Sequence, residues 1–290
     1  MSREAEWQVR AAAWELLALS LRYPDEVLAE AIASGEWESA AAEIAEALGI
    51  GEGEEGDALD AAPAPGPDPA STAPTPAAPA PAPTIASAMR HADACGTADA
   101  RRGAAPPARP APDAMNWGLP ARPAPDAMNG GLPARPAPPA LLRSLRVEAT
   151  RLFVGAPEPA VSPYEGVDRA LAEGARPLLF VNPRSMDVER FVRSCGLGRP
   201  AGANEPLDHV AAECELLSYL ASLAAGAPAP AGAPCGAALP GGSPQAAYAA
   251  FLDAHARRWM PAFAAAVRAE ARAPFYAAAA RLLAAVVERG

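Results

Sequence analysis

Proline and alanine dominate a continuous segment of the chain from residue 51 to residue 140. Of the 35 prolines in the 290 residues, 20 fall between residues 61 and 140, and large aliphatic side chains are scarce there. Such a segment cannot bury enough apolar surface to offset the entropy lost on ordering it. We therefore predict a disordered insert over residues 51–140, which leaves a foldable part of about 200 residues.

The insert contains a short tandem repeat. Residues 108–120 recur at 121–133 with one change, from Trp117 to Gly130. A thirteen-residue period filled with proline is too short and too stiff for a solenoid unit, so it indicates an expanded linker. Extended proline segments also dock onto partner proteins, which gives the insert an alternative interpretation as an interaction segment.

Outside the insert, apolar side chains recur at three- and four-residue steps, which is the spacing of one helical face. We expect the first helix over residues 3–22, ended by Tyr23-Pro24, and a second helix opened by Pro24. The remaining helices are expected over residues 37–48, 141–155, 163–173 and 185–195, then from Pro206 onward, followed by two or three more after a proline- and glycine-rich loop at 226–244.

No stretch of the sequence alternates apolar and polar residues in the way a half-buried strand does. The predicted class is therefore all-α, a compact helical bundle of about 8–10 helices interrupted by the insert. Residues 1–50 supply the N-terminal helices and residues 141–290 the C-terminal helices of the same domain. The long loops fit either a monomer or a domain-swapped dimer.

The chain is acidic, with 34 acidic residues against 24 basic ones and a formal charge of −10; all the basic residues are arginines. A negative surface repels phosphate backbones and anionic lipids, so we expect neither a nucleic-acid partner nor stable membrane insertion. The same charge favours a basic peptide as partner, because it steers the encounter. Its simpler explanation is solubility alone.

The cysteines show no paired C-x-x-C spacing, which fits a reducing compartment. The N-terminus, Met1-Ser2-Arg3-Glu4, lacks the basic and then apolar run of a secretory signal, and no apolar run reaches membrane-spanning length. We therefore expect a cytoplasmic protein.

Two compact motifs combine carboxylates with aromatic or imidazole side chains: Ser162-Pro163-Tyr164-Glu165 and Glu205-Pro206-Leu207-Asp208-His209. Helix capping explains each of them structurally. In the first, Ser162 is expected as N-cap, with Glu165 closing a capping box. In the second, Asp208 suits the third position of a helix opened by Pro206, where the macrodipole favours its charge.

Taken with Leu21-Arg22-Tyr23-Pro24 and Leu152-Phe153-Val154-Gly155, these motifs resemble the TorD/DmsD family of chaperones for molybdenum-containing redox enzymes. The glutamate-proline-x-aspartate-histidine signature is matched at every fixed position by residues 205–209. The chain departs from the family at Gly166, where serine is frequent, and at a few packing positions. The insert is not a general family feature.

The resemblance implies a cytoplasmic chaperone that binds the twin-arginine signal peptide, or the apo form, of a molybdopterin-dependent oxidoreductase of the DMSO/TMAO-reductase type. It would support cofactor insertion before export. A twin-arginine leader presents two guanidinium groups and an apolar helix-forming stretch, so its receptor needs fixed carboxylates beside an apolar groove. The candidate client-binding residues are Tyr164, Glu165, Glu205, Pro206, Asp208 and His209.

We expect no enzymatic activity, no metal and no cofactor. The three histidines are widely spaced, and the nearest approach to a zinc motif is His209 with Glu213 at i and i+4. Cys214 has no basic neighbour in sequence to lower its pKa, and no phosphate-binding loop is present. Three alternatives stay open: a NarJ-like chaperone for a non-exported molybdoenzyme, a helical hydrolase or nucleotide-binding protein using Asp208, His209 and Glu213, and a helical interaction module.

Overall fold

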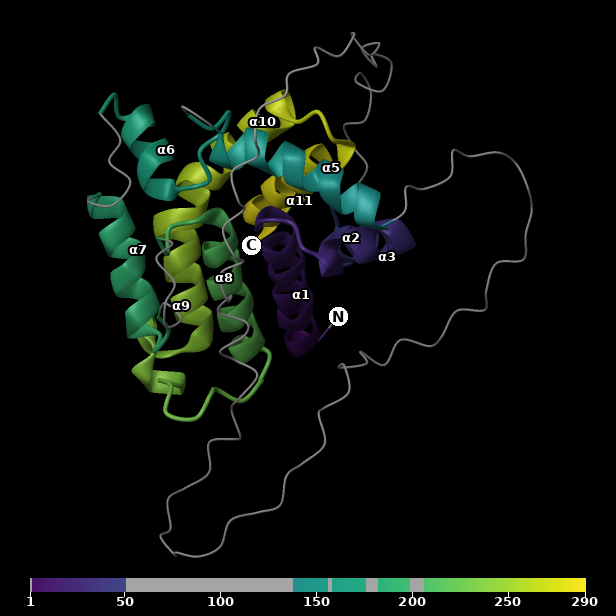
Figure 1. The fold of residues 1–290 in the computed structure, drawn as a ribbon. Coiled ribbons are helices and arrows are strands. Elements are labelled where there is room, and N and C mark those ends of the chain that lie inside the picture. Colours follow the sequence, from purple (N-terminus) through teal and green to yellow (C-terminus); the bar gives the residue numbers. More distant parts are fainter. Residues whose placement is uncertain (1, 51–137, 156–157, 176–181, 199–205) are drawn as a thin grey trace, which may run out of the picture.

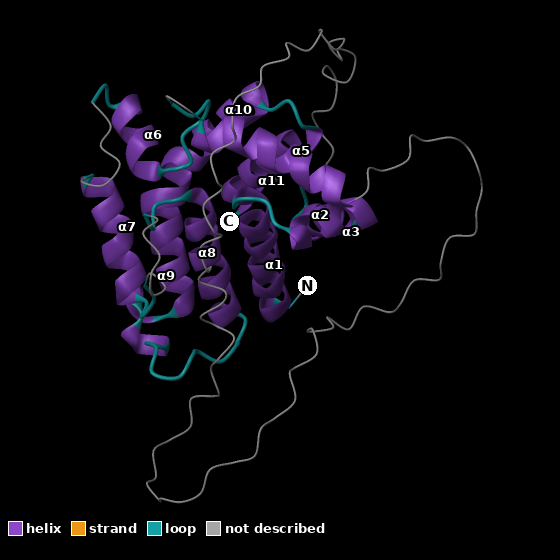
Figure 2. Cartoon of the chain, in the orientation of Figure 1, coloured by secondary structure: helices purple, strands orange, loops and turns teal. Residues whose placement is uncertain are grey.

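A computed structural model describes residues 2–50, 138–155, 158–175, 182–198 and 206–290 (Figure 1). Within these ranges every regular element is a helix and no strand is present, which confirms the all-α prediction for the described residues (Figure 2). The predicted insert lies outside them except for its last three residues. The helices are α1 (Arg3–Leu21), α2 (Glu26–Ser34), α3 (Glu36–Ala47), α5 (Pro138–Ala149), α6 (Glu165–Ala172), α7 (Pro183–Ser194), α8 (Val210–Ala224), α9 (Pro244–Phe251), α10 (Arg257–Glu270) and α11 (Pro274–Arg289).

The N-terminal helices form close to their expected positions, with one correction. The prediction that Pro24 opens the second helix is wrong, because α2 begins at Glu26. Asp25 is its N-cap, and the Asp25 carboxylate accepts a hydrogen bond from the Leu28 N–H at 3.0 Å. Gly35 then joins α2 to α3 with a left-handed φ of 87°, a conformation that glycine adopts without a steric penalty.

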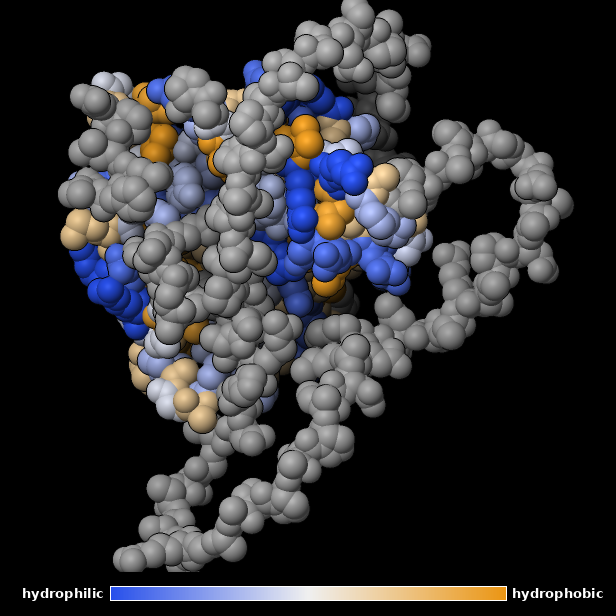
Figure 3. All heavy atoms as spheres, viewed as in Figure 1, coloured by the Kyte–Doolittle hydropathy of each residue, from blue (hydrophilic) through white to orange (hydrophobic). Residues whose placement is uncertain are grey.

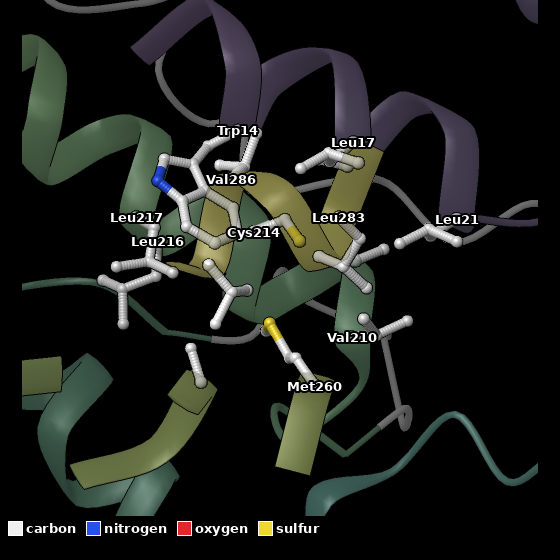
Figure 4. Close-up of a cluster of buried hydrophobic side chains, with 14 of the residues drawn as sticks. Trp14, Leu17, Leu21, Val210, Cys214, Leu216, Leu217, Met260, Leu283 and Val286 are labelled. Carbon is white, nitrogen blue, oxygen red and sulfur yellow. The ribbon is translucent and has the colours of Figure 1, made fainter. Parts of the chain in front are cut away.

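Helix α1 packs along α8 and against α11 and α3. Trp14 of α1 is fully buried among side chains of α8, α10 and α11 (Figure 4). Its indole Nε1 donates a hydrogen bond to Tyr248 Oη of α9 at 2.8 Å, so the one polar atom of this buried ring has a partner. The helices before residue 50 therefore share a core with those after residue 206.

Two π-helical turns interrupt the regular helices. One, Thr150–Val154, follows α5, and the other, Leu252–Ala256, joins α9 to α10. A π-helical turn shifts the register of the side chains that follow it and is frequent at functional sites. The second turn carries His255, which faces α6 as described below.

Helices α6 and α7 lie at the edge of the bundle, beside α10 and α9 (Figure 1). α6 contacts α10, and Phe191 of α7 packs on Phe251 of α9 with ring centroids 5.1 Å apart. Asn182 caps α7, and Pro183 occupies its first turn. This pair of helices and the start of α8 form the frame of the candidate site.

Candidate functional site

The two sequence motifs meet in space. Tyr164 and His209 form an isolated antiparallel β-bridge, and their rings pack edge to face with centroids 5.3 Å apart. The Glu165 N–H donates to the Asp208 carbonyl at 3.0 Å, and the Val210 N–H donates to the Pro163 carbonyl at 2.8 Å. Residues about forty positions apart in sequence are thus held side by side by main-chain hydrogen bonds.

This pairing displaces the starts of both helices. The capping interpretation of Ser162 and Glu165 is wrong, because α6 begins at Glu165 with Tyr164 as N-cap and no side-chain cap bond. The prediction that a helix opens at Pro206, which would place Asp208 in its first turn, is wrong too. α8 begins at Val210, and His209 is its N-cap, with the ring Nδ1 accepting from the Ala211 N–H at 3.1 Å.

Asp208 lies inside the protein with 1% of its surface exposed. Its Oδ2 accepts hydrogen bonds from Ser185 Oγ at 2.5 Å and from the Gly166 N–H at 3.0 Å. Burial raises the pKa of Asp208, and these two hydrogen bonds partly offset that rise. The carboxylate therefore links the start of α6 to α7.

Gly166 is required by the close approach of these groups. A Cβ atom at this position would lie 2.5 Å from Ser185 Oγ and 2.9 Å from Asn182 Cγ. The Asn182 Nδ2 also donates to the Gly166 carbonyl at 2.6 Å. The departure from the family pattern at Gly166 thus coincides with tight packing of α6 against α7.

Glu165 is completely buried and binds two basic side chains. Its Oε1 accepts from Arg169 Nη1 at 2.6 Å, one helical turn on, and its Oε2 lies 2.8 Å from His255 Nδ1 in the π-helical turn. Both carboxylate oxygens therefore have partners, and the residue ties α6 to the junction of α9 and α10.

Glu213 extends this network into the core. Its Oε2 accepts a hydrogen bond from Trp259 Nε1 at 3.0 Å, while its Oε1 is buried without a hydrogen-bond partner among the described residues. Burial first, and then the charge of Glu165, raise the pKa of Glu213 well above its ordinary value. A protonated Glu213 can donate a hydrogen bond to Glu165, so the two carboxyl groups can lie close together without two negative charges.

The candidate residues from the sequence differ in their access to solvent. Tyr164 and His209 are half-buried, Pro206 is buried, and Glu165 and Asp208 are buried with partners from the protein itself. Glu205 lies outside the described residues. Sequence analysis missed Arg169, His255 and Trp259 as partners of the buried carboxylates. Phe251, His255 and Trp259 follow one another at four-residue steps, a spacing that predicts a buried helix face but not the contact of His255 with Glu165.

A pocket of about 450 Å³ adjoins the network between α6, α7 and the π-helical turn. Arg169 and His255, which bind Glu165, form part of its wall. The surface over the lower part of α7 is mostly hydrophilic (Figure 3). The full lining consists of Arg169, Arg184, Asp187, Arg190, Phe191, Ser194, Pro240, Ala254 and His255.

Two further properties concern the described residues alone. They contain no group of three or more histidine, cysteine, aspartate or glutamate side chains arranged to hold a metal ion. None of the described helices has both the length and the apolar content needed to cross a membrane.

Burial raises the pKa of Cys214 well above its ordinary value, so its thiol packs as a small apolar group.

Comparison with known proteins gives one match. Residues 131–265 match the family described as nitrate reductase delta subunit, over somewhat less than half of the chain. Both motifs of the site lie within the matched residues. Curated proteins and solved structures gave no match. The match is consistent with the superfamily of the resemblance and does not separate the TorD/DmsD branch from the NarJ branch.

Proposed function

We propose that this protein is a chaperone that holds the apo form of a molybdenum-containing oxidoreductase during its assembly. The observation that carries the proposal is the family match over residues 131–265, which contains both halves of the Tyr164–His209 bridge. The all-helical fold of the described residues is consistent with it. A chaperone of this kind acts by binding, so it needs a stable frame and an accessible client-binding surface rather than reactive groups.

We further propose that the client segment is a twin-arginine leader, bound at the joined motifs. Tyr164 and His209 are the half-buried residues there, so they can contact a peptide without a change in the fold. Glu165 and Asp208 would contribute indirectly, without contact to the peptide, because their oxygens hold α6, α7 and the π-helical turn in place. Glu205 directly precedes Pro206 in sequence and is the carboxylate we propose for the leader's guanidinium groups.

The family description favours a second candidate. A NarJ-like chaperone would bind a molybdoenzyme that is not exported, through a segment of the enzyme that lacks the twin arginines. The two candidates share the fold and the class of client, and they differ in the peptide recognised.

Calorimetric titration distinguishes the two. The purified chain is titrated with a twin-arginine leader from a molybdenum reductase of the same organism, with the same leader after both arginines are changed to glutamine, and with the apo catalytic subunit lacking the leader. Binding that depends on the arginines supports leader recognition. Binding of the leaderless subunit alone supports the NarJ-like mode, and no binding in any titration contradicts the chaperone proposal.

His209 gives the sharpest test of where the leader binds. His209→Asn keeps a side chain that caps a helix well but removes the imidazole from the bridge. Weaker leader binding at an unchanged melting temperature would support contact at this position. Unchanged affinity in His209→Asn and in Tyr164→Phe would place the leader elsewhere on the protein.

A further inference from the structure

The pocket beside α7 is rich in arginine. Its lining contains three arginines and a single carboxylate, that of Asp187, in a protein with a formal charge of −10. Each of these three guanidinium groups is paired with one carboxylate, that of Glu165, Glu173 or Asp187, so an anionic group that binds here has to compete with that partner.

One side of the pocket is apolar and aromatic. Phe191 packs on Phe251 behind it and lies 6.4 Å from the His255 ring, measured between centroids. Pro240 and Ala254 complete this side. The pocket therefore offers an apolar surface next to guanidinium groups, which suits a ligand that carries an anionic group beside an apolar one.

The arginines of the pocket fall into two kinds. Arg184 and Arg190 form ion pairs with Glu173 and Asp187, and the arginine side chains of these pairs are 41% and 72% exposed. Pairs that exposed contribute little, so an arriving carboxylate can replace the partner at small cost. Arg169 is 17% exposed and holds the buried Glu165, so it belongs to the frame of the site.

We propose that this pocket receives an acidic segment of the client enzyme, in which a carboxylate side chain stands next to an apolar or aromatic one. Arg184 and Arg190 bind the carboxylate, and Phe191 contacts the apolar side chain. A protein segment fits better than a free small molecule, since the exposed arginines would leave most of a small ligand in solvent. The inference rests on the proposed function and adds a second contact, separate from the Tyr164–His209 bridge.

The first test measures binding of the leaderless apo catalytic subunit of a molybdenum reductase from the same organism. Arg184→Gln with Arg190→Gln should weaken this binding about tenfold, since two charge-assisted contacts are lost. The matched control, Arg143→Gln with Arg268→Gln, removes the same charge from exposed positions on α5 and α10 and should bind as the wild type does. The difference between the two variants should shrink as the salt concentration rises.

The second test identifies the bound segment. Ser194 is exposed at the pocket, so p-benzoylphenylalanine placed there can be cross-linked to the client by light and the linked peptide identified by mass spectrometry. A linked peptide rich in aspartate and glutamate is expected. A basic peptide would overturn the proposal, and so would equal affinity of the two arginine variants while the client still binds. Failure of the client to bind the wild-type chain would instead overturn the proposed function, and this inference with it.

Discussion

Glu213 provides the most direct test of the buried network, through the substitution Glu213→Gln. The glutamine oxygen can accept the hydrogen bond from Trp259 Nε1, which the Glu213 Oε2 accepts at 3.0 Å. Its amide nitrogen can donate toward Glu165, as a protonated carboxyl group would. The variant therefore keeps the contacts of neutral Glu213 and cannot ionise.

The expected effect follows from the raised pKa of Glu213 in the folded protein. Above the ordinary value of 4.5, the unfolded chain releases this proton while the folded protein keeps it, so rising pH favours unfolding. This contribution to stability is complete below the unfolded pKa and is lost as the pH rises toward the folded pKa. In that window the wild type should lose up to about 1.4 kcal/mol per pH unit relative to the variant.

Urea unfolding followed by circular dichroism at several values between pH 5 and pH 8 measures the difference. The free energy of unfolding of Glu213→Gln, minus that of the wild type, should grow with pH. Glu288→Gln, on the exposed end of α11, is the control and should keep the pH dependence of the wild type. A difference that stays constant across this range would refute the assignment of a protonated Glu213 in the folded protein.

Three other predictions concern Gly166, the cap of α8 and the proline-rich segment. Gly166→Ala should destabilise the protein by about 1–3 kcal/mol, since its Cβ would lie 2.5 Å from Ser185 Oγ. Gly198→Ala is the control, because no atom lies within 4 Å of a Cβ there, and equal melting temperatures of the two variants would contradict the close approach at Gly166. His209→Ala should cost about 0.5–2 kcal/mol through loss of the α8 cap, and thermal melting should show most of this recovered in His209→Asn. Replacing residues 51–137 by a flexible linker should leave both the melting temperature and client binding unchanged; loss of binding would mean that the proline-rich segment docks the client.

Helix positions were predictable where local signals decide them. The apolar spacing that predicted a helix over residues 3–22 corresponds to α1 over Arg3–Leu21, and the one predicted over 185–195 corresponds to α7 over Pro183–Ser194. In both cases a residue with a capping side chain directly precedes the helix, Ser2 before α1 and Asn182 before α7. Apolar periodicity and helix caps involve residues that are close together in sequence, so the sequence alone is enough to locate these two helices.

The starts of α6 and α8 were predicted wrongly because a long-range pairing decides them. Tyr164 and His209 adopt extended conformations, with φ and ψ of −115° and 126° and of −72° and 137°. The residues beside them exchange main-chain hydrogen bonds, from the Glu165 N–H to the Asp208 carbonyl and from the Val210 N–H to the Pro163 carbonyl, and each helix begins only after this pairing. Local capping rules do not include a partner that lies about forty residues away.

The partners of the carboxylates were not predictable for the same reason. His255 and Trp259 reach Glu165 and Glu213 across separations of 90 and 46 residues. Their four-residue spacing on one helix face predicts burial, and burial is what the structure has. The spacing holds no information about which buried polar atom each ring meets.

The burial of Asp208 changes what substitution of the signature can reveal about client binding. Replacing Asp208 by alanine would remove acceptors for Ser185 and the Gly166 N–H inside the protein, so weakened binding would follow from a loosened frame even without any contact to the client. The same holds for Glu165, whose loss would leave Arg169 and His255 without their carboxylate partner. Informative substitutions are therefore those at accessible side chains, at His209 for the leader and at Arg184 with Arg190 for the acidic segment, because they leave the buried network intact.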